Sequence, residues 1–496
     1  MIQSTLQILL QPTCLAVMLG SVILGIIFGA IPGLTSNMAV TLILPLTFKM
    51  TSNLGISTLM SIYVGGMSGG FIAATLVGIP GTPSSIATCF DAYPLSQKGQ
   101  TTKALAAGTI GSFIGTFFST LIAIFFCPLI AKVAVKLGPW EYFGLCAMAI
   151  TLVVSLSKGN MFKGLAAACI GLLLSSVGYA PFDATARFTF HITSISGGIN
   201  MVALMLGTFA IYQVIINYAT DQQKLPDVSN SKISGIGITL QEWKDNIANI
   251  IRSFLIGLWI GFLPGMGAGI SNLVAYSQSK SASKHPEEYG KGCIDGVFAS
   301  EVSNNASIGG AVIPMIALGI PGDTVTAIML SGLMIHGIEP GPLLMTKEPI
   351  LVYVIFGTLL ISAVMTLILQ LTGMRLFPKL LMIPYHYLFG AIAIICFVGA
   401  YSDTNNLFNC GLMLGCAVFA LLMQMAGLPM GPMMLAFILG GQLETNLRRS
   451  MMMAKGNPMV FLTRPISCIF LLISLLSIVI PLLKPVLSKA KNAKEG

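Results

Sequence analysis

Long apolar segments follow one another along most of this chain, with only short polar stretches between them. Four runs without a charged residue, 1–48, 254–279, 349–374 and 404–443, each exceed the ~20 residues that a membrane-spanning helix needs. Segments of this length are typical of helices in a lipid bilayer. The pattern predicts long helices at about 15–31, 54–77, 104–131, 139–157, 162–178, 199–218, 250–263, 296–318, 349–374, 382–400, 407–426 and 459–484.

Shorter apolar segments lie between these helices and contain proline and glycine. They are 35–48, 82–93, 267–279, 323–336 and 430–442. Each is too short or too interrupted to cross a bilayer as an ordinary helix, so we expect half-helices or re-entrant hairpins there. The expected fold is an all-α polytopic membrane protein with about 10–12 transmembrane helices.

Composition and charge narrow the class further. Hydrophobic residues make up 55% of the 496 residues and charged residues 9%, which excludes a soluble globular protein. The net charge of +9 comes from Lys and Arg scattered singly through short loops, so it fits contact with lipid and predicts no nucleic-acid partner. No basic residue precedes the first apolar run, so we expect that segment to be retained and not cleaved as a signal peptide. The ten cysteines form no CxxC pair, and we expect neither a disulfide nor a metal site.

Two pairs of Pro–Gly motifs occur at corresponding places in the two halves of the chain. Pro32 and Pro264, each followed by glycine, are 232 residues apart, and Pro80 and Pro321 are 241 residues apart. Further motifs recur in the same order, which indicates an internal duplication. They include Gly69-Gly70 with Gly309-Gly310 and Phe143-Gly144 with Phe389-Gly390.

The duplication predicts how the chain is organised. We expect a first transmembrane repeat at 1–218, a polar linker at 219–248, a second repeat at 249–455, and a C-terminal helix with a basic tail at 456–496. Basic loops alternate between corresponding positions of the two halves, which predicts inverted repeats. In transporters built this way, broken helices at matching places mark the binding site.

The four breaks supply candidate substrate-binding residues. Free backbone N–H groups and a partial positive charge at the start of a half-helix favour a carboxylate, and nearby hydroxyl and amide groups add donors. For one break, a simple kink is the alternative, but four repeated breaks favour a site. The candidates are Pro32, Gly33, Thr35, Ser36, Asn37, Pro80, Gly81, Thr82, Ser84, Gly265, Gly267, Ser271, Asn272, Pro321, Gly322 and Thr324.

A second group of residues could bind a cation. Glu301, Asn304 and Asn305 place a carboxylate and two amides within five residues, just before the last break, and Asp323 follows that break. Carboxylates are costly within a membrane, and such oxygen ligands suit Na⁺ while a lone carboxylate can carry a proton. We therefore predict ion coupling at Glu301, Asn304, Asn305 and Asp323, with a polar loop end at the membrane surface as the alternative.

Several motifs in combination resemble one transporter family. Gly70 to Pro83, Phe90-Asp91-Ala-Tyr-Pro94, Gly261-Phe-Leu-Pro-Gly265 and His336-Gly-Ile-Glu-Pro340-Gly-Pro-Leu are similar to the TctA family, the large membrane subunit of the tripartite tricarboxylate transporters. The resemblance runs from about Gly25 to Arg449. The sequence departs from the pattern of the family at three residues: Thr35 and Ser36, where glycine and often proline are usual, and Ser300, where proline is usual.

The resemblance implies a multi-pass protein of the bacterial inner membrane that imports a tricarboxylate or related carboxylate, driven by a Na⁺ or H⁺ gradient. It also implies two protein partners, a periplasmic solute-binding protein and a small membrane subunit. No catalytic residue, metal or other cofactor is expected. One alternative is an intramembrane aspartyl protease that uses Asp91 and Asp323, although the repeat gives no reason for these two carboxylates to meet. The other is a channel or ion exchanger that works without a binding protein.

Overall fold

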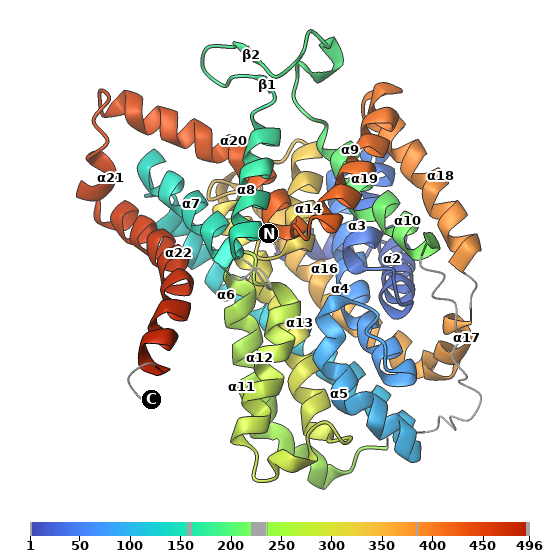
Figure 1. Ribbon diagram of the computed structural model, residues 1–496. Coiled ribbons are helices and arrows are strands. Elements are labelled where there is room, and N and C mark those ends of the chain that lie inside the picture. The colour runs from blue at the N-terminus through green and yellow to red at the C-terminus, as the bar shows by residue number, and fades with distance from the viewer. Residues whose placement is uncertain (1, 156–160, 220–234, 236, 383–384, 493–496) are drawn as a thin grey trace. The chain divides into compact units, whose positions relative to one another are not determined.

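The computed structural model describes residues 2–155, 161–219, 235, 237–382 and 385–492 (Figure 1). Most of the predicted linker, 220–234 and 236, and the last four residues of the basic tail lie outside the described residues. The chain forms two units. Unit 1 comprises Met1–Ala131, Val202–Leu263 and Gly267–Ala417, and unit 2 comprises Lys132–Met201, Pro264–Met266 and Val418–Gly496.

Unit 1 consists of helices, and α6 and α19 run from it into unit 2. The helices are α1 (Ile2–Leu9), α2 (Pro12–Ala30), α3 (Ser36–Ile43), α4 (Ser52–Val77), α5 (Ile86–Leu95), α6 (Thr101–Ala134), α9 (Met201–Met205), α10 (Tyr212–Ala219), α11 (Leu240–Phe262), α12 (Gly267–Ala282), α13 (Ile294–Leu318), α14 (Thr324–Ile335), α15 (Leu344–Lys347), α16 (Pro349–Gly373), α17 (Phe377–Leu381), α18 (Tyr385–Thr404) and α19 (Phe408–Met425). Short 3-10 or π segments join some of them: η1 (Leu44–Lys49), η2 (Pro83–Ser85), η3 (Ser96–Gln100), η5 (Leu206–Ile211), η6 (Pro286–Glu288) and η7 (Met374–Leu376).

Unit 2 contains helices α7 (Pro139–Ser155), α8 (Met161–Ser175), α20 (Met430–Met453), α21 (Val460–Thr463) and α22 (Pro465–Asn492). In this unit α20 packs on α7 and α8, and α22 packs on α7. After α8 comes a two-stranded antiparallel hairpin, β1 (Gly178–Tyr179) and β2 (Ala186–Arg187), in which Gly178 is opposite Arg187. The 3-10 turn η4 (Thr193–Ile195) follows it.

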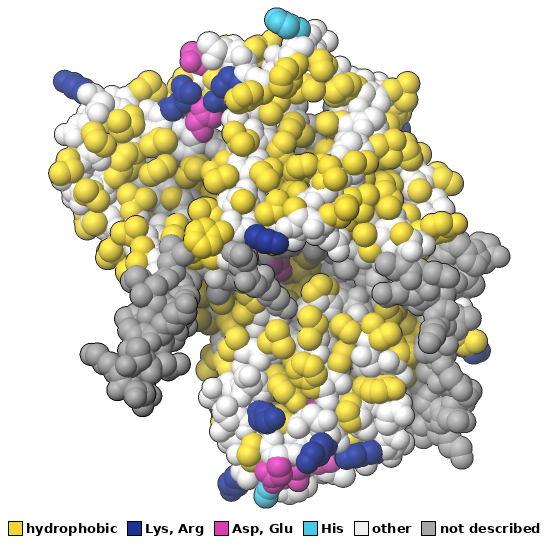
Figure 2. Space-filling model, viewed as in Figure 1, with side chains coloured by type: hydrophobic (Ala, Val, Ile, Leu, Met, Phe, Trp, Pro, Cys, Tyr) yellow, Lys and Arg dark blue, Asp and Glu magenta, His cyan; other side chains and the backbone are white. Residues whose placement is uncertain are grey.

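The described helices fit a multi-pass membrane protein. Six stretches are long and apolar enough to cross a bilayer: Pro12–Ala30, Ser52–Val77, Pro83–Ala134, Met201–Ala219, Pro349–Leu381 and Phe408–Met425. Shorter apolar helices include Pro139–Ser155, Met161–Ser175 and Thr324–Ile335. Hydrophobic side chains cover much of the visible surface, and charged side chains gather at the end of the α11–α13 group where α12 connects to α13 (Figure 2). An apolar flank with a charged end is what a bilayer requires.

Two of the predicted helix boundaries were wrong. Helix α11 begins at Leu240, about ten residues before the expected start and inside the predicted linker, because Thr239 and Glu242 form a reciprocal capping box there. Helix α20 is 24 residues long, whereas the sequence suggested a short piece ending near residue 442. The polar residues after 442 remain helical, and the apolar pattern did not predict them because it ends there.

The four breaks have local causes that recur in both halves. Helices α2 and α11 end at Ile31 and Leu263, which adopt extended backbone because the following proline disfavours the helical conformation. Helices α4 and α13 end at Gly78 and Gly319, with φ of 69° and 71°. Glycine adopts this left-handed conformation without a steric penalty. The same offsets of 232 and 241 residues relate these endings, so corresponding breaks in the two halves have the same backbone conformation.

Helices α4 and α13 form the centre of unit 1, and almost all of their residues are buried. Each packs closely on one partner, α4 on α2 and α13 on α11 (Figure 1). A Cβ atom on Gly69 would lie 2.6 Å from the Ile26 carbonyl oxygen, and one on Gly310 would lie 2.4 Å from that of Leu258. Gly69 therefore corresponds to Gly310, which corrects by one residue the pairing read from the sequence. Close backbone approach through small residues is how helices associate in membranes.

Candidate functional site

The second and fourth breaks are each held against a neighbouring helix by a glycine. A Cβ atom on Gly81 would lie 2.1 Å from the Gly29 carbonyl oxygen, and one on Gly322 would lie 2.4 Å from that of Gly261. The backbone N–H of Gly81 also donates to the Gly70 carbonyl at 3.2 Å. No larger side chain fits at Gly81 or Gly322 without moving backbone, so these two predicted residues set the positions of the broken segments.

In the first half, hydroxyl groups gather over the glycines of α4. Ser36, the first residue of α3, lies over Gly66, and Thr82 lies over Gly70. The Thr82 hydroxyl is 2.8 Å from that of Ser84, and both side chains are buried. Thr35 caps α3 by accepting a hydrogen bond from the Met38 N–H at 3.2 Å. Asn37 and Pro32 beside these groups are half-buried.

Around Gly33 the chain turns with φ of 87°, and its carbonyl oxygen accepts a hydrogen bond of 2.8 Å from the Asn217 amide. The first break is thereby tied to α10 at the end of the first half. Asn217 is a contact that the sequence did not reveal.

The start of α12, which follows the third break, lies beside the second and fourth breaks within unit 1. A Cβ atom on Gly267 would lie 3.3 Å from the Asp323 Cβ, and one on Gly269 would lie 3.4 Å from the Pro83 carbonyl oxygen. The side-chain amide oxygen of Asn272 accepts a hydrogen bond of 2.7 Å from the Ala87 N–H at the start of α5. Predicted residues from three separate segments therefore share one region of unit 1.

Two of the predicted substrate-binding residues are less suited to bind a ligand: one is hydrogen-bonded to a neighbouring helix, and the other belongs to unit 2. The Ser271 hydroxyl is 2.5 Å from that of Ser303 and fixes α12 to α13. Gly265 belongs to unit 2, where a Cβ atom would lie 1.7 Å from a methyl group of Val153. Both residues therefore have evident packing roles.

A fully buried carboxylate, Glu301, lies on α13 beside α5 and α6. It accepts hydrogen bonds from the hydroxyl groups of Thr88 at 2.5 Å and Ser112 at 3.2 Å. The amides of Asn304 and Asn305 lie 3.5 and 3.4 Å from the same carboxylate. These four partners are all neutral donors. A buried carboxylate is costly unless it is protonated or meets a cation, so this group calls for a proton or a metal ion.

Asn305 extends this cluster to both repeats. Its amide carbonyl accepts hydrogen bonds from the hydroxyls of Ser68 on α4 at 2.9 Å and Thr116 on α6 at 3.4 Å, and its NH₂ donates to Ser112 at 2.9 Å. All four side chains are buried. The three predicted residues 301, 304 and 305 thus form one hydrogen-bonded cluster at the contact between the halves.

Asp323 occupies the N-terminus of α14. One carboxylate oxygen accepts hydrogen bonds of 2.7 Å from both the N–H and the hydroxyl of Thr326, and the other accepts one of 2.7 Å from the Tyr63 hydroxyl on α4. The position at this helix N-terminus where we expected an anion is therefore occupied by the Asp323 side chain. Thr324, a predicted substrate-binding residue, is the first residue of the helix after it. An incoming anion would meet a negative charge here, whereas a cation or a proton would be favoured.

Two of the candidate residues carry a buried polar atom that has no hydrogen-bond partner among the described residues. The two atoms are the Ser36 hydroxyl and the Asn304 amide oxygen, on residues that are 3% and 0% exposed. Buried polar groups are normally paired, so unpaired ones point to a ligand or an ordered water. The hydroxyl can donate to an anion, and the amide oxygen can accept from a donor or bind a cation.

Asp91 has a structural role separate from Asp323. One of its oxygens accepts three backbone hydrogen bonds, from Gly290 and Cys293 and from Gly292 between them, at 2.8 to 2.9 Å. The other accepts a hydrogen bond from the Tyr276 hydroxyl at 2.9 Å. These partners differ entirely from those of Asp323, so the described contacts give no carboxylate pair of the kind an aspartyl protease uses.

The residues that the sequence did not identify are mostly hydroxyl-bearing side chains within apolar helices. A stripe on α6 carries Thr109, Ser112, Thr116 and Ser119, all buried and spaced three to four residues apart. That spacing places them on one helix face, and it was the available signal for Ser112 and Thr116. No comparable signal marked Tyr63 or Thr88.

Comparison with known proteins gives a consistent family match. The family model described as the tripartite tricarboxylate transporter TctA family matches residues 15–435. A protein of Agrobacterium vitis named "Uncharacterized 52.8 kDa protein in TAR-I ttuC' 3'region" is 34% identical over 468 residues, which cover 94% of this chain and 93% of that protein. A second A. vitis protein, named "Uncharacterized protein in TAR-II ttuC' 3'region", is 36% identical over 233 residues, 47% of this chain and 96% of its own length. No solved structure matches.

Proposed function

Because the chain belongs to the TctA family of tripartite tricarboxylate transporters, we propose that it imports a tricarboxylate or related carboxylate through the bacterial inner membrane. In this proposal transport is driven by a Na⁺ or H⁺ gradient and requires a periplasmic solute-binding protein and a small membrane subunit. The chain is the large, multi-pass membrane subunit of that system.

The observation that carries the proposal is the meeting of broken helices from both repeats next to a buried polar cluster. Helix breaks expose backbone groups that lipid cannot satisfy, so they are tolerated only where protein or a polar ligand surrounds them. Here the segments at Gly81, Gly267 and Gly322 adjoin buried hydroxyls, amides and two carboxylates. This combination supports a binding site for a polar solute.

The anion and the cation would use different residues. Ser36 offers an unpaired buried hydroxyl, and Thr82 and Ser84 add two more hydroxyls at the second break. These groups would bind substrate carboxylate oxygens together with the N-terminal N–H groups of α3. Glu301 and the Asn304 amide oxygen would bind the coupling ion. The carboxylate occurs in one repeat only, since the residue corresponding to Glu301 is Met60.

Uptake by proteoliposomes tests this proposal. Vesicles would contain this chain and the small membrane subunit, with the solute-binding protein added outside and a Na⁺ or H⁺ gradient imposed. We expect accumulation of labelled citrate or another di- or tricarboxylate that depends on both the gradient and the binding protein. Uptake without the binding protein would instead indicate a channel or exchanger.

The matched variants are Glu301→Gln and Glu288→Gln. Glu301→Gln removes the buried charge while keeping the shape of the side chain, so gradient-driven uptake should fall at least tenfold. Glu288 is exposed at the end of η6, and its variant should transport as the wild type does. Full gradient dependence in Glu301→Gln would exclude this residue from ion coupling.

A further inference from the structure

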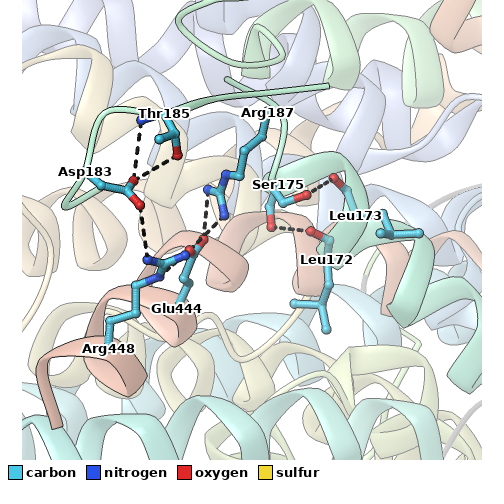
Figure 3. Close-up of polar contacts among 9 residues, drawn as sticks. Leu172, Leu173, Ser175, Asp183, Thr185, Arg187, Glu444 and Arg448 are labelled. Carbon is cyan, nitrogen blue, oxygen red and sulfur yellow. Dashed lines mark hydrogen bonds and ion pairs between the residues drawn. The ribbon is translucent and has the colours of Figure 1, made fainter. Parts of the chain in front are cut away.

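A polar cluster of unit 2 fixes the segment that follows α8, residues 178–200, here called the aromatic loop (Figure 3). Arg187 donates two hydrogen bonds to the Glu444 carboxylate on α20, of 2.8 and 3.0 Å. Arg448, one helical turn further along α20, donates to the same carboxylate at 2.8 Å and lies 3.9 Å from Asp183. A paired guanidinium and carboxylate in this fork geometry is among the stronger polar contacts.

The cluster persists at neutral pH. The hydrogen bond from Thr185 lowers the pKa of Asp183, and the hydrogen bonds from Arg187 lower the pKa of Glu444, so both carboxylates are charged. Two acidic and two basic side chains cancel, and the cluster carries no net charge. It therefore orders the loop without adding net charge.

Large apolar side chains project from this ordered loop. Tyr179, Phe182, Phe188, Phe190 and Ile192 are 59%, 44%, 57%, 78% and 42% exposed. The backbone at Phe188 and Phe190 has φ of 52° and 48°, a conformation that bulky residues rarely adopt. Such strain tends to occur where a side chain has to be held for binding.

Lipid tails cannot cover these side chains. The loop is irregular, and irregular backbone exposed to hydrocarbon does not occur because its polar groups would lack partners. The loop is also unlike a segment that binds a membrane surface. Its charges cancel instead of forming a basic patch, and among its described residues it has three phenylalanines and no tryptophan, whereas interfacial belts favour Trp and Tyr.

We propose that the aromatic loop is the docking surface for a soluble protein partner, the solute-binding protein of the same transport system. The inference rests on the proposed function, which requires such a partner. A fixed cluster of exposed aromatic residues is the typical centre of a protein interface, and a rigid loop loses little entropy on binding. The loop consequently faces the periplasm.

The test measures binding of the cognate solute-binding protein, with and without its carboxylate, to the full-length chain in lipid nanodiscs. The double variant Phe188→Ser with Phe190→Ser removes two anchors and leaves the ion pairs intact. We expect its affinity to fall at least tenfold. Arg187→Gln, which releases the loop from α20, should weaken binding by a smaller factor because the loop must then be ordered on binding.

Leu173→Ser is the matched control, because Leu173 is 60% exposed on the neighbouring helix α8 and lies outside the loop. It should bind as the wild type does. Thermal stability and the elution volume of each variant establish that it is folded. Equal affinity of the double variant and the wild type would overturn the docking surface while leaving the proposed function intact. No binding to the wild-type chain would overturn both.

Two further outcomes bear on the location of the loop. In intact spheroplasts, a membrane-impermeant maleimide should label the Phe190→Cys variant more strongly than the wild type. Labelling that occurs only after lysis would place the loop on the cytoplasmic side and refute the proposal. In a Phe190→Trp variant, quenching by brominated lipids beyond that of the three wild-type tryptophans would show that the loop lies in the membrane interface instead. We expect quenching by bound solute-binding protein and not by lipid.

Discussion

The packing of the second break predicts a large effect from a single methyl group. In Gly81→Ala the new Cβ would lie 2.1 Å from the Gly29 carbonyl oxygen and 3.0 Å from that of Gly70. Ordinary contacts with Cβ begin near 3.4 Å, so the two backbones must separate by more than 1 Å. Overpacking of this kind costs typically 1–3 kcal/mol, and we expect about 3 kcal/mol because backbone, which has no alternative rotamer, must move.

The duplication supplies an internal replicate and the chain supplies a control. Gly322→Ala places its Cβ 2.4 Å from the Gly261 carbonyl oxygen, so it should destabilise the protein by a similar amount. Gly20→Ala has no atom within 4 Å of its Cβ. It lies within α2, where alanine is favoured over glycine by up to ~1 kcal/mol, so it should be neutral or stabilising.

Thermal unfolding in detergent, followed by fluorescence-detected size-exclusion chromatography, measures these differences. We expect the midpoints of Gly81→Ala and Gly322→Ala to fall by roughly 3 °C or more relative to Gly20→Ala. Gradient-driven uptake should also fall in both, because the broken segments are displaced. A midpoint for Gly81→Ala equal to that of Gly20→Ala would refute the close packing of the second break on α2.

Three more outcomes follow from named contacts. Asp91→Asn replaces charge-assisted hydrogen bonds by neutral ones, so it should lower the free energy of unfolding by about 3 kcal/mol. Protease should then cleave the segment 283–293. Asp245 is exposed, so Asp245→Asn should change neither the stability nor the cleavage. Tyr63→Phe removes the hydrogen bond to a buried carboxylate, so the thermal midpoint should fall by the equivalent of about 1–3 kcal/mol, and an unchanged midpoint would argue against that contact. The lowered pKa values of Asp183 and Glu444 mean that their ion pairs stabilise the folded loop above the ordinary carboxylate range and are lost as the pH falls through the lowered values. Proteolysis of the aromatic loop should therefore be constant from about pH 5 to 8 and rise only below about pH 4, and a rise near pH 6 would contradict this assignment.

Apolar patterning predicted most of the helices because a bilayer constrains local sequence strongly. The long helices α4, α6, α13 and α16 begin and end within a few residues of the predicted bounds. The positions of proline and glycine predicted the breaks, because these residues restrict or free the backbone only at their own position and at the adjacent residue. The start of α11 depended on a polar cap, which hydrophobicity does not register.

The sequence by itself determined the membrane class, the duplicated breaks and the candidate cluster at Glu301, because these follow from the composition and spacing of neighbouring residues. Only the tertiary structure decided what those residues contact. Thr88 and Ser112, the partners of Glu301, lie 213 and 189 residues away along the chain, and Arg187 lies 257 residues from Glu444. Such pairs form when helices distant in sequence pack together, and an isolated hydroxyl or arginine gives no local sign of its future partner. The Pro–Gly breaks thus gave the candidate site, and helix packing decided which groups surround it.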